Sequence, residues 1–344
     1  MPKVTVQLVT WNGKRYLPWL FGTLREQTFS DFDVIVLDNG STDGTVDQIK
    51  ELEPHVKFTM RIIALEKNTG FAGGHNRVFG EHESPYVLLL NQDMLLAPDY
   101  IERLVSLMDA HEDAGAASGV LYRWDWERRE EGEGGRTKVV DTTGLMVTRS
   151  RRVLDYGMGR TDIEIPEGPY EVFGVSGALP MYRRSVLEEV NGAKRIFDPR
   201  FFSYKEDVDL AFRLRLAGSH AFVDPKANAW HDRTVRGTQG SLGTAVKERS
   251  RKSSFGNSLS YRNHLLCLWK NECWSNFAKD FLWMIPYETA KFFWVLLREW
   301  GTVPALIDAL KQLPEVMRDR HAIQKNRKVS PSELRKWWNR PWVV

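Results

Sequence analysis

The chain has 344 residues, of which 42% are apolar and 27% are charged. This composition is typical of a globular protein with one large domain or two smaller ones, and it excludes disordered and fibrous classes. The net charge of +3 conceals an uneven distribution, because residues 240–344 hold 18 basic and 9 acidic residues and 8 of the 13 tryptophans. We therefore expect two parts with different roles, residues 1–239 and 240–344.

The cysteine content and the apolar segments place further bounds on the chain. Cys267 and Cys273 are too few for a disulfide framework and fit no metal-binding spacing, so we expect free thiols in a reducing compartment. No apolar signal segment precedes the first strand-like run. The most apolar later stretch, 277–297, contains four charged residues and a proline, so we expect no transmembrane segment.

The first hundred residues alternate between apolar, strand-like runs and helix-like segments. The strand-like runs are 4–10, 33–38, 60–66 and 86–91. The other segments predict helices over 16–27, 45–52, 75–81 and 98–111, the third after a glycine-rich turn at 68–74. Because the strands are apolar on both faces, they predict a parallel sheet covered by helices on both sides, which is the doubly wound α/β class.

The later segments are less regular. Residues 124–138 are charged and glycine-rich, which predicts a surface loop, whereas 206–218 predicts a helix and 221–231 a strand. The region after residue 240 is helical in pattern. There Pro286 predicts a helix end or kink, and the sequence Ser330-Pro331-Ser332-Glu333 predicts a capping box that starts the final helix.

Polar side chains follow each of the four early strands. The ends of strands in an open α/β sheet form the edge where ligands bind, so these clusters predict a site for a large polar ligand. The plainer interpretation is that polar turns simply follow strands. The four clusters are Thr10-Trp11-Asn12, Asp38-Asn39-Gly40, Asn68-Thr69-Gly70 and Asn91-Gln92-Asp93.

Two acidic residues are candidates for chemistry. Asp93 follows an apolar strand, where a carboxylate can hold a divalent cation beside a diphosphate or form a local turn. Asp207 heads an apolar stripe formed with Leu210, Ala211 and Leu214, so it either caps the helix or points into a cleft. The helix dipole would lower its pKa and burial would raise it, and a general base needs a pKa near the working pH.

Seven motifs follow one another along residues 4–231. They are VTWNG, LDNGSTDGT, NTGFAGGHN, LLLNQD, GVSGA, FDPRFFSYKEDVDLAFRLRLAG and the later His231. This ordered set resembles glycosyltransferase family 2, in particular its bacterial rhamnosyltransferase-like branch, and it continues more loosely through 262–271. The resemblance implies a GT-A fold, a Rossmann-like domain over 1–239 that takes a nucleotide-diphosphate sugar and inverts the anomeric centre.

The resemblance also implies roles for single residues. Asp207 matches the catalytic base and Glu206 its neighbour. Asp93 matches the last acid of the D-x-D metal motif, and His231 completes the shell around Mg²⁺ or Mn²⁺. The residues implied to bind the nucleotide sugar are Thr10, Asn12, Asp38, Asn39, Gly73, His75, Asn76, Asn91 and Gln92, of which Asn91 departs from the acid usual at the first motif position.

Two features lie outside these roles. Asp209 and Arg213, four residues apart, predict a supporting ion pair on the helix surface. The basic, tryptophan-rich residues 240–344 form a mainly helical extension whose composition suits an anionic membrane surface. The alternatives are that these helices pack on the catalytic domain or form a homodimer contact. We expect no nucleic-acid partner, because no recognised binding module is present.

We therefore predict an inverting, metal-dependent glycosyltransferase, with dTDP-rhamnose as the leading donor. Its acceptor would be a cell-surface polysaccharide or a polyprenyl-linked glycan, met in the cytoplasm at the inner face of the plasma membrane. A UDP-sugar donor is the alternative within the same fold. A non-catalytic glycan-binding or scaffold subunit is the alternative from another class, and the presence of both Asp93 and Asp207 argues against it.

Overall fold

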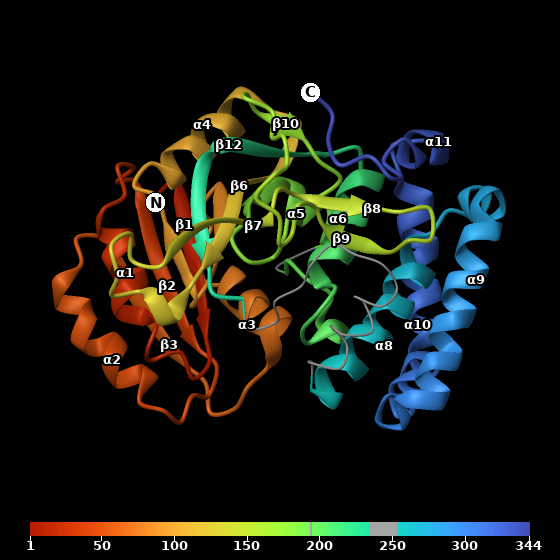
Figure 1. Ribbon diagram of the computed structural model, residues 1–344, viewed down its shortest axis with the longest axis horizontal. Helices are drawn as coiled ribbons and strands as arrows, with labels where there is room; N and C mark the ends of the chain where they lie inside the picture. The colour runs from red at the N-terminus through yellow and green to blue at the C-terminus, as the bar shows by residue number, and fades with distance from the viewer. Residues whose placement is uncertain (193–194, 234–252) are drawn as a thin grey trace.

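The computed structural model describes residues 1–192, 195–233 and 253–344. Its N-terminal part is built on a ten-stranded sheet with the order β10-β12-β6-β11-β4-β1-β2-β3, to which β5 adds beside β12 and β7 beside β6 (Figure 1). The strands are β1 (Val4–Thr10), β2 (Phe32–Asp38), β3 (Thr59–Ala64), β4 (Tyr86–Asn91), β5 (Met94–Leu96), β6 (Ala114–Trp124), β7 (Arg136–Thr142), β10 (Tyr170–Glu171), β11 (Met181–Arg183) and β12 (His220–His231).

The four early strands are parallel, as the sequence predicts. In register, Val4 of β1 lies opposite Phe32 of β2 and Tyr86 of β4, so the carboxyl ends of these strands meet at one edge. The sheet as a whole is mixed, however, because β11 enters between β4 and β6 and runs antiparallel to both. The predicted parallel sheet of the four early strands is confirmed. The antiparallel direction of β11 was not predicted, since a strand of three residues carries no signal of strand direction.

Helices cover both faces of the sheet, because successive strand residues point to opposite sides. One face packs on α1 (Leu17–Arg25), α2 (Thr45–Leu52) and α4 (Tyr100–Ala110). The other packs on α3 (Gly70–Phe79), α5 (Arg184–Asn191) and α6 (Glu206–Leu216). In β4, Leu88 and Leu90 belong to the first core and Val87 and Leu89 to the second, which explains why this strand is apolar throughout.

The glycine-rich segment is part of α3 and not a turn before it. The helix begins at Gly70, which has φ +80° and on which a Cβ would lie 2.4 Å from the carbonyl oxygen of Phe202. A Cβ on Gly74 would lie 2.8 Å from Cγ1 of Val9 in β1. The glycines therefore allow a close approach of α3 to the strand end, and the predicted helix start near residue 75 is corrected.

The segment predicted as a charged surface loop at 124–138 is partly ordered by tryptophans. Trp124 ends β6, a 3-10 turn covers Trp126–Arg128, and β7 begins at Arg136. Both tryptophan rings are buried against Tyr16, with ring centroids 5.9 and 4.7 Å from it. Burial of these large rings outweighs the local charge and glycine content.

The C-terminal helices pack on the N-terminal part. They are α8 (Ser254–Asn271), α9 (Trp274–Arg298), α10 (Val303–Asn326) and α11 (Pro331–Arg335). A shared core joins Phe173 and Phe212 to Trp337 and Trp338. The predicted boundary at 239/240 lies outside the described residues. The capping box is confirmed, whereas α9 continues through Pro286, so the predicted helix end there is wrong and the alternative of a kink stays a prediction.

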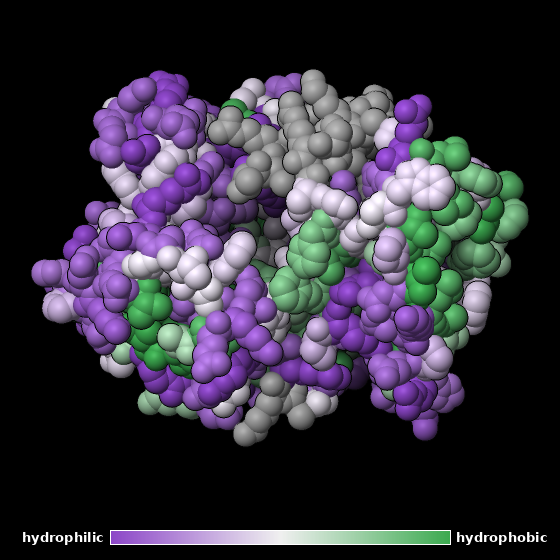
Figure 2. Space-filling view, turned by 90° about the horizontal axis from the view of Figure 1, so that it is seen from below, coloured by the Kyte–Doolittle hydropathy of each residue, from purple (hydrophilic) through white to green (hydrophobic). Residues whose placement is uncertain are grey.

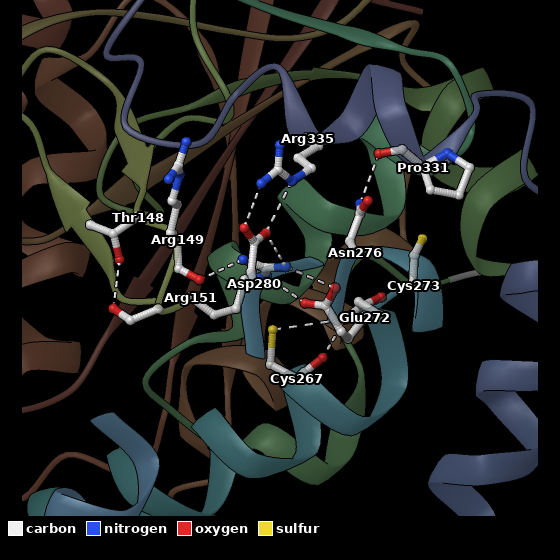
Figure 3. Close-up of polar contacts among 12 residues, drawn as sticks. Thr148, Arg149, Arg151, Cys267, Glu272, Cys273, Asn276, Asp280, Pro331 and Arg335 are labelled. Carbon is white, nitrogen blue, oxygen red and sulfur yellow. Dashed lines mark hydrogen bonds and ion pairs between the residues drawn. The ribbon is translucent and has the colours of Figure 1, made fainter. Parts of the chain in front are cut away.

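An ion-pair network fastens α9 to the β8–β9 hairpin (Leu145–Val147 and Val153–Asp155). The buried Arg151 guanidinium contacts Glu272 at 2.5 Å and Asp280 at 3.1 Å, and Arg335 reaches Asp280 at 2.7 Å. Figure 3 shows this network. Hydrophobic side chains gather at the helical end of the molecule, as Figure 2 shows. Within the described residues, no helix is both long and apolar enough to cross a membrane.

Candidate active site

The polar clusters that follow β1 and β4 are hydrogen-bonded to each other. The Thr10 hydroxyl donates to Oε1 of Gln92 at 2.6 Å, and the Trp11 N–H donates to the same oxygen at 2.8 Å. The Trp11 side chain is half exposed. Gln92, a predicted nucleotide-sugar-binding residue, therefore uses its side-chain oxygen to hold the ends of two parallel strands together.

The clusters after β1 and β2 are joined in the same way. Asn12 has φ 50°, its N–H donates to Oγ of Ser41 at 2.8 Å, and its Oδ1 accepts from the Thr42 N–H at 2.9 Å. Asp38 accepts from the Ser41 N–H at 3.0 Å through Oδ2. Its Oδ1 is buried and has no hydrogen-bond partner among the described residues, which leaves an acceptor at the strand end.

Asn39 connects β2 to the start of α3. Its Oδ1 accepts from the Thr69 N–H at 2.8 Å, and its Nδ2 donates to the Gly70 carbonyl at 3.0 Å. The predicted meeting of the polar clusters at one edge of the sheet is therefore confirmed, because all four are linked through side chains.

Three predicted residues lie along α3 and have internal partners. His75 is fully buried, its Nδ1 lies 3.1 Å from Oε1 of Gln7, and burial lowers the pKa of its ring to about 3. Asn76 accepts from the N–H of Phe197 at 2.8 Å and donates to its carbonyl at 2.9 Å. Gly73 packs one turn from Thr69. His75 and Asn76 therefore stabilise the core and a loop, and their predicted place near the diphosphate or sugar stays a prediction.

The start of α6 lies beside the end of β4. The N–H of Asn91 donates to the Ala178 carbonyl at 3.1 Å, and the N–H of the preceding Gly177 donates to Oδ2 of Asp207 at 3.1 Å. One dipeptide thus contacts both the strand end and the candidate base. Asp207 is therefore at the same edge of the sheet as Asp93, although a long stretch of sequence separates them.

His231 lies between two carboxylates. Its Nδ1 is 2.9 Å from Oδ2 of the buried Asp141, and its Nε2 is 3.4 Å from Oδ1 of Asp93. Burial alone would lower the pKa of the imidazole, but Asp93 and Asp141 outweigh it and raise the pKa to about 10. The ring is therefore oriented by Asp141 with its other nitrogen directed at Asp93.

Arg233 extends this cluster toward Asp207. Its Nε lies 3.3 Å from Oδ1 of Asp141, and its Nη1 lies 2.8 Å from Oδ2 of Asp155. Burial and the nearby Asp155 carboxylate both raise the pKa of Asp207. A continuous series of charged contacts therefore runs from Asp93 to the surroundings of Asp207.

The two acids at the start of α6 differ in environment. Asp207 is half buried and accepts two backbone N–H groups, from Gly177 at 3.1 Å and Val208 at 2.8 Å. Glu206 is buried, its Oε2 has no hydrogen-bond partner among the described residues, and burial together with Asp207 raises its pKa to about 8. Burial and the neighbouring carboxylate therefore favour the protonated form of Glu206.

The predicted pair of Asp209 and Arg213 is present but not on the helix surface. Oδ2 of the fully buried Asp209 lies 2.8 Å from both Arg213 Nε and Lys270 Nζ. Asn271 donates to its Oδ1 at 2.8 Å. Because α8 covers this side of α6, the pair joins the two helices inside the protein.

Sequence reasoning missed Asp141, Asp155 and Arg233. No spacing rule connects them, since Asp141 lies in β7, Asp155 ends β9 and Arg233 follows the end of β12. The available signal was an acid directly after two valines, at Asp141 in the strand RTKVVDT. Within the described part of the chain, no three His, Cys, Asp or Glu side chains are grouped closely enough to hold a metal by themselves. The two cysteines are free and buried, as predicted.

Comparison with known proteins identifies the family. The model of glycosyl transferase family 2 matches residues 5–190. An N-acetylglucosaminyl-diphospho-decaprenol L-rhamnosyltransferase from Mycobacterium tuberculosis is 29% identical over 244 residues, which covers 66% of this chain and 75% of that protein. A validoxylamine A glucosyltransferase from Streptomyces hygroscopicus is 26% identical over 129 residues, 36% of this chain and 30% of that protein.

Solved structures share the fold. The mannosyltransferase PcManGT from Pyrobaculum calidifontis, in complex with GDP-Man and Mn²⁺, has a TM-score of 0.53 at 18% identity, and the match covers 98% of this chain and 84% of the PcManGT chain. S. aureus TarS 1-349 in complex with UDP-GlcNAc has a TM-score of 0.54 at 16% identity, and the match covers 98% of this chain and 92% of the TarS chain. The GT-A fold with a helical C-terminal region is thus confirmed, and since the family model spans more than half of the sequence, the chain belongs to glycosyltransferase family 2.

Proposed function

We propose that the chain transfers a sugar from a nucleotide-diphosphate donor to a hydroxyl group of a glycan acceptor, with inversion at the anomeric carbon. The observation that carries this proposal is the convergence of Asp93 and Asp207 at the carboxyl edge of the sheet. The Gly177–Ala178 backbone and the contacts of His231 and Arg233 bring them there. An inverting transfer needs these two functions together, a group that offsets charge on the leaving diphosphate and a base for the acceptor.

Asp207 is the proposed general base, and its surroundings suit that role. Its raised pKa brings a carboxylate closer to the working pH, which favours proton uptake from an attacking hydroxyl. The Gly177 N–H holds one oxygen in place at 3.1 Å. Glu206 is the neighbouring acid that stays neutral, so it adds no second negative charge beside the base.

Asp93 and His231 would hold the divalent cation, Mg²⁺ or Mn²⁺. Two protein ligands are sufficient for such an ion, because substrate phosphate oxygens and waters complete its shell. The donor set fits, since His231 is oriented through its Nδ1 by the buried carboxylate of Asp141, the arrangement usual for a metal-binding histidine. When bound, the cation supplies positive charge against the diphosphate leaving group.

The nucleotide would lie along the linked ends of β1, β2 and β4. The buried Oδ1 of Asp38 is an acceptor in need of a donor, which the N3–H of thymine or uracil could provide. dTDP-rhamnose is the proposed sugar donor, supported by the rhamnosyltransferase from Mycobacterium tuberculosis. A UDP-sugar is the second candidate, supported by the TarS complex with UDP-GlcNAc.

The proposed acceptor is a cell-surface polysaccharide or a polyprenyl-linked glycan, and the proposed place of action is the cytoplasmic face of the plasma membrane. The relative from Mycobacterium tuberculosis is named for a decaprenol-linked acceptor, which supports this choice. Such an acceptor keeps its lipid in the bilayer, so the enzyme would work peripherally at the membrane.

A thermal-shift screen with nucleotide sugars tests the proposal. With Mn²⁺ present, dTDP-rhamnose should raise the melting temperature, because a ligand that binds only the folded state stabilises it. The Asp93→Asn variant should lose the Mn²⁺-dependent part of that shift. A shift with a UDP-sugar alone would select the second donor, and no shift with any nucleotide sugar would contradict the function. Donor binding without transfer to any glycan would favour the non-catalytic alternative.

A further inference from the structure

One side of α9 is an exposed apolar surface. Its large side chains lie at positions that follow the helical repeat, so they share one face of the helix, and we call this set the outer face. The set extends over almost the whole helix, roughly 35 Å at 1.5 Å per residue. Its members are Trp274, Phe281, Leu282, Ile285, Phe293 and Leu297, with exposed fractions of 68, 48, 72, 39, 52 and 69%.

Exposure on this scale indicates a binding surface. Isolated exposed apolar residues are ordinary, but a continuous apolar patch on a protein surface marks a contact with a partner or a membrane. Figure 2 shows the hydrophobic side chains gathered at the helical end of the molecule. The smaller Ala278 and Thr289, which lie between the large residues along α9, are also exposed and uncharged.

The inner side of α9 is held in place by buried ion pairs at Asp280 and by a contact between Glu288 and His264. Asp280 is fully buried and contacts Arg151 at 3.1 Å and Arg335 at 2.7 Å (Figure 3). Glu288 lies 2.7 Å from Nε2 of His264 on α8. Rolling the helix to bury its outer face would break these contacts and leave buried charges unpaired, which is costly. Among the described residues of the chain, none can therefore cover the outer face without breaking these contacts.

The exposed charges of α9 are positive. Lys279 lies at the edge of the outer face, and Arg298 lies at the C-terminal end of the helix. Both acids of α9, Asp280 and Glu288, are directed inward and paired, whereas Lys279 and Arg298 are exposed. A second copy of this surface would bring the same positive charge, but anionic lipid headgroups complement it. The combination of aromatic and aliphatic side chains with flanking cations is typical of helices that lie in a membrane interface.

We propose that the outer face of α9 docks on an anionic lipid bilayer, with the helix axis in the plane of the membrane. The aromatic and leucine side chains enter the boundary between headgroups and acyl chains, and Lys279 and Arg298 contact the phosphates. This inference rests on the proposed function only because a lipid-linked acceptor requires the enzyme at a bilayer. Binding to vesicles needs neither donor nor acceptor, so the membrane docking and the proposed sugar transfer are tested separately.

Vesicle flotation with the full chain tests the proposal. Vesicles of phosphatidylethanolamine and phosphatidylglycerol should bind the protein, and phosphatidylcholine vesicles should bind it less. The triple variant Leu282→Gln, Phe293→Gln, Leu297→Gln should bind roughly 10-fold or more weakly, because three exposed apolar side chains no longer enter the interface. The melting temperature of this variant should match that of the wild type, since none of the three side chains is buried.

A double charge-reversal variant tests the electrostatic contribution to vesicle binding. Lys279→Glu with Arg298→Glu should weaken binding to anionic vesicles by roughly 10-fold or more. Lys50→Glu with Lys57→Glu, the same change at exposed positions in and after α2 at the other end of the molecule, should leave binding unchanged (Figure 1). Wild-type protein that stays off anionic vesicles, or a triple variant that binds them as well as the wild type, would overturn the proposal. So would a dimer in light scattering that the triple variant converts to a monomer, because the face would then belong to a second copy.

Discussion

The buried Glu206 carboxyl should make the stability of the protein depend on pH. Burial and the adjacent Asp207 raise its pKa from 4.5 to about 8. An acid whose pKa is raised by folding contributes its full stability below its unfolded pKa and loses it as pH rises to the folded value. At about 1.4 kcal/mol per pKa unit, this shift corresponds to a loss on the order of 5 kcal/mol.

Glu206→Gln removes the titration with little change in shape. The free energy of unfolding of this variant, measured by urea titration, should exceed that of the wild type by an amount that grows by roughly 1.4 kcal/mol per pH unit. The growth should occupy the window between pH 4.5 and about 8 and then level off. Glu171→Gln is the control of opposite sign, because His220 and Arg215 overcome burial and lower the pKa of Glu171.

The Glu171→Gln variant should lose stability relative to the wild type above pH 4.5, where the ionised Glu171 is paired. Parallel stability curves for the wild type and Glu206→Gln would refute the reasoning. In that case Glu206 would be ionised in the folded protein at neutral pH, and the base would have a second negative charge beside it.

Three further changes test the scaffold and the metal ligands. Asp280→Ala should lower the free energy of unfolding by about 3–5 kcal/mol, because it leaves two arginines without their shared carboxylate; a loss below about 1 kcal/mol would contradict this. Gly70→Ala should cost about 1–3 kcal/mol in the same assay, since its Cβ would meet the Phe202 carbonyl at positive φ, and unchanged stability would count against it. Asp141→Asn should weaken Mn²⁺ binding roughly 10- to 100-fold in calorimetry by releasing His231, whereas equal affinity would argue against the proposed ligand.

The parallel core of the fold follows from the sequence, because apolar strands and their polar ends are local signals. The strand at Tyr86–Asn91 and the helix at Thr45–Leu52 have the predicted bounds. The direction of β11 could not be predicted, since pairing with β4 and β6 depends on contacts far apart in the chain. Pro286 and the tryptophans of 124–138 show local rules being outweighed by packing.

The candidate site was predictable only in part. Asp93, Asp207 and His231 stand in motifs, and the structure brings them to one edge of the sheet. Asp141 and Arg233 carry no motif, and their role depends on the pairing of β7 with β6 and of β12 with β6. His75 stands in a motif but is buried, which a pattern of residue types cannot reveal.

The central claim is that Asp207 accepts the proton from the acceptor hydroxyl. The most direct measurement compares Asp207→Asn with the wild type in two assays, donor binding by calorimetry and sugar transfer to a polyprenyl-linked glycan. Donor affinity should stay within a few fold, because the Gly177 N–H and the edge of the sheet remain in place, while transfer should fall by roughly 100-fold or more. Transfer by Asp207→Asn at the wild-type rate would show that Asp207 is not the base.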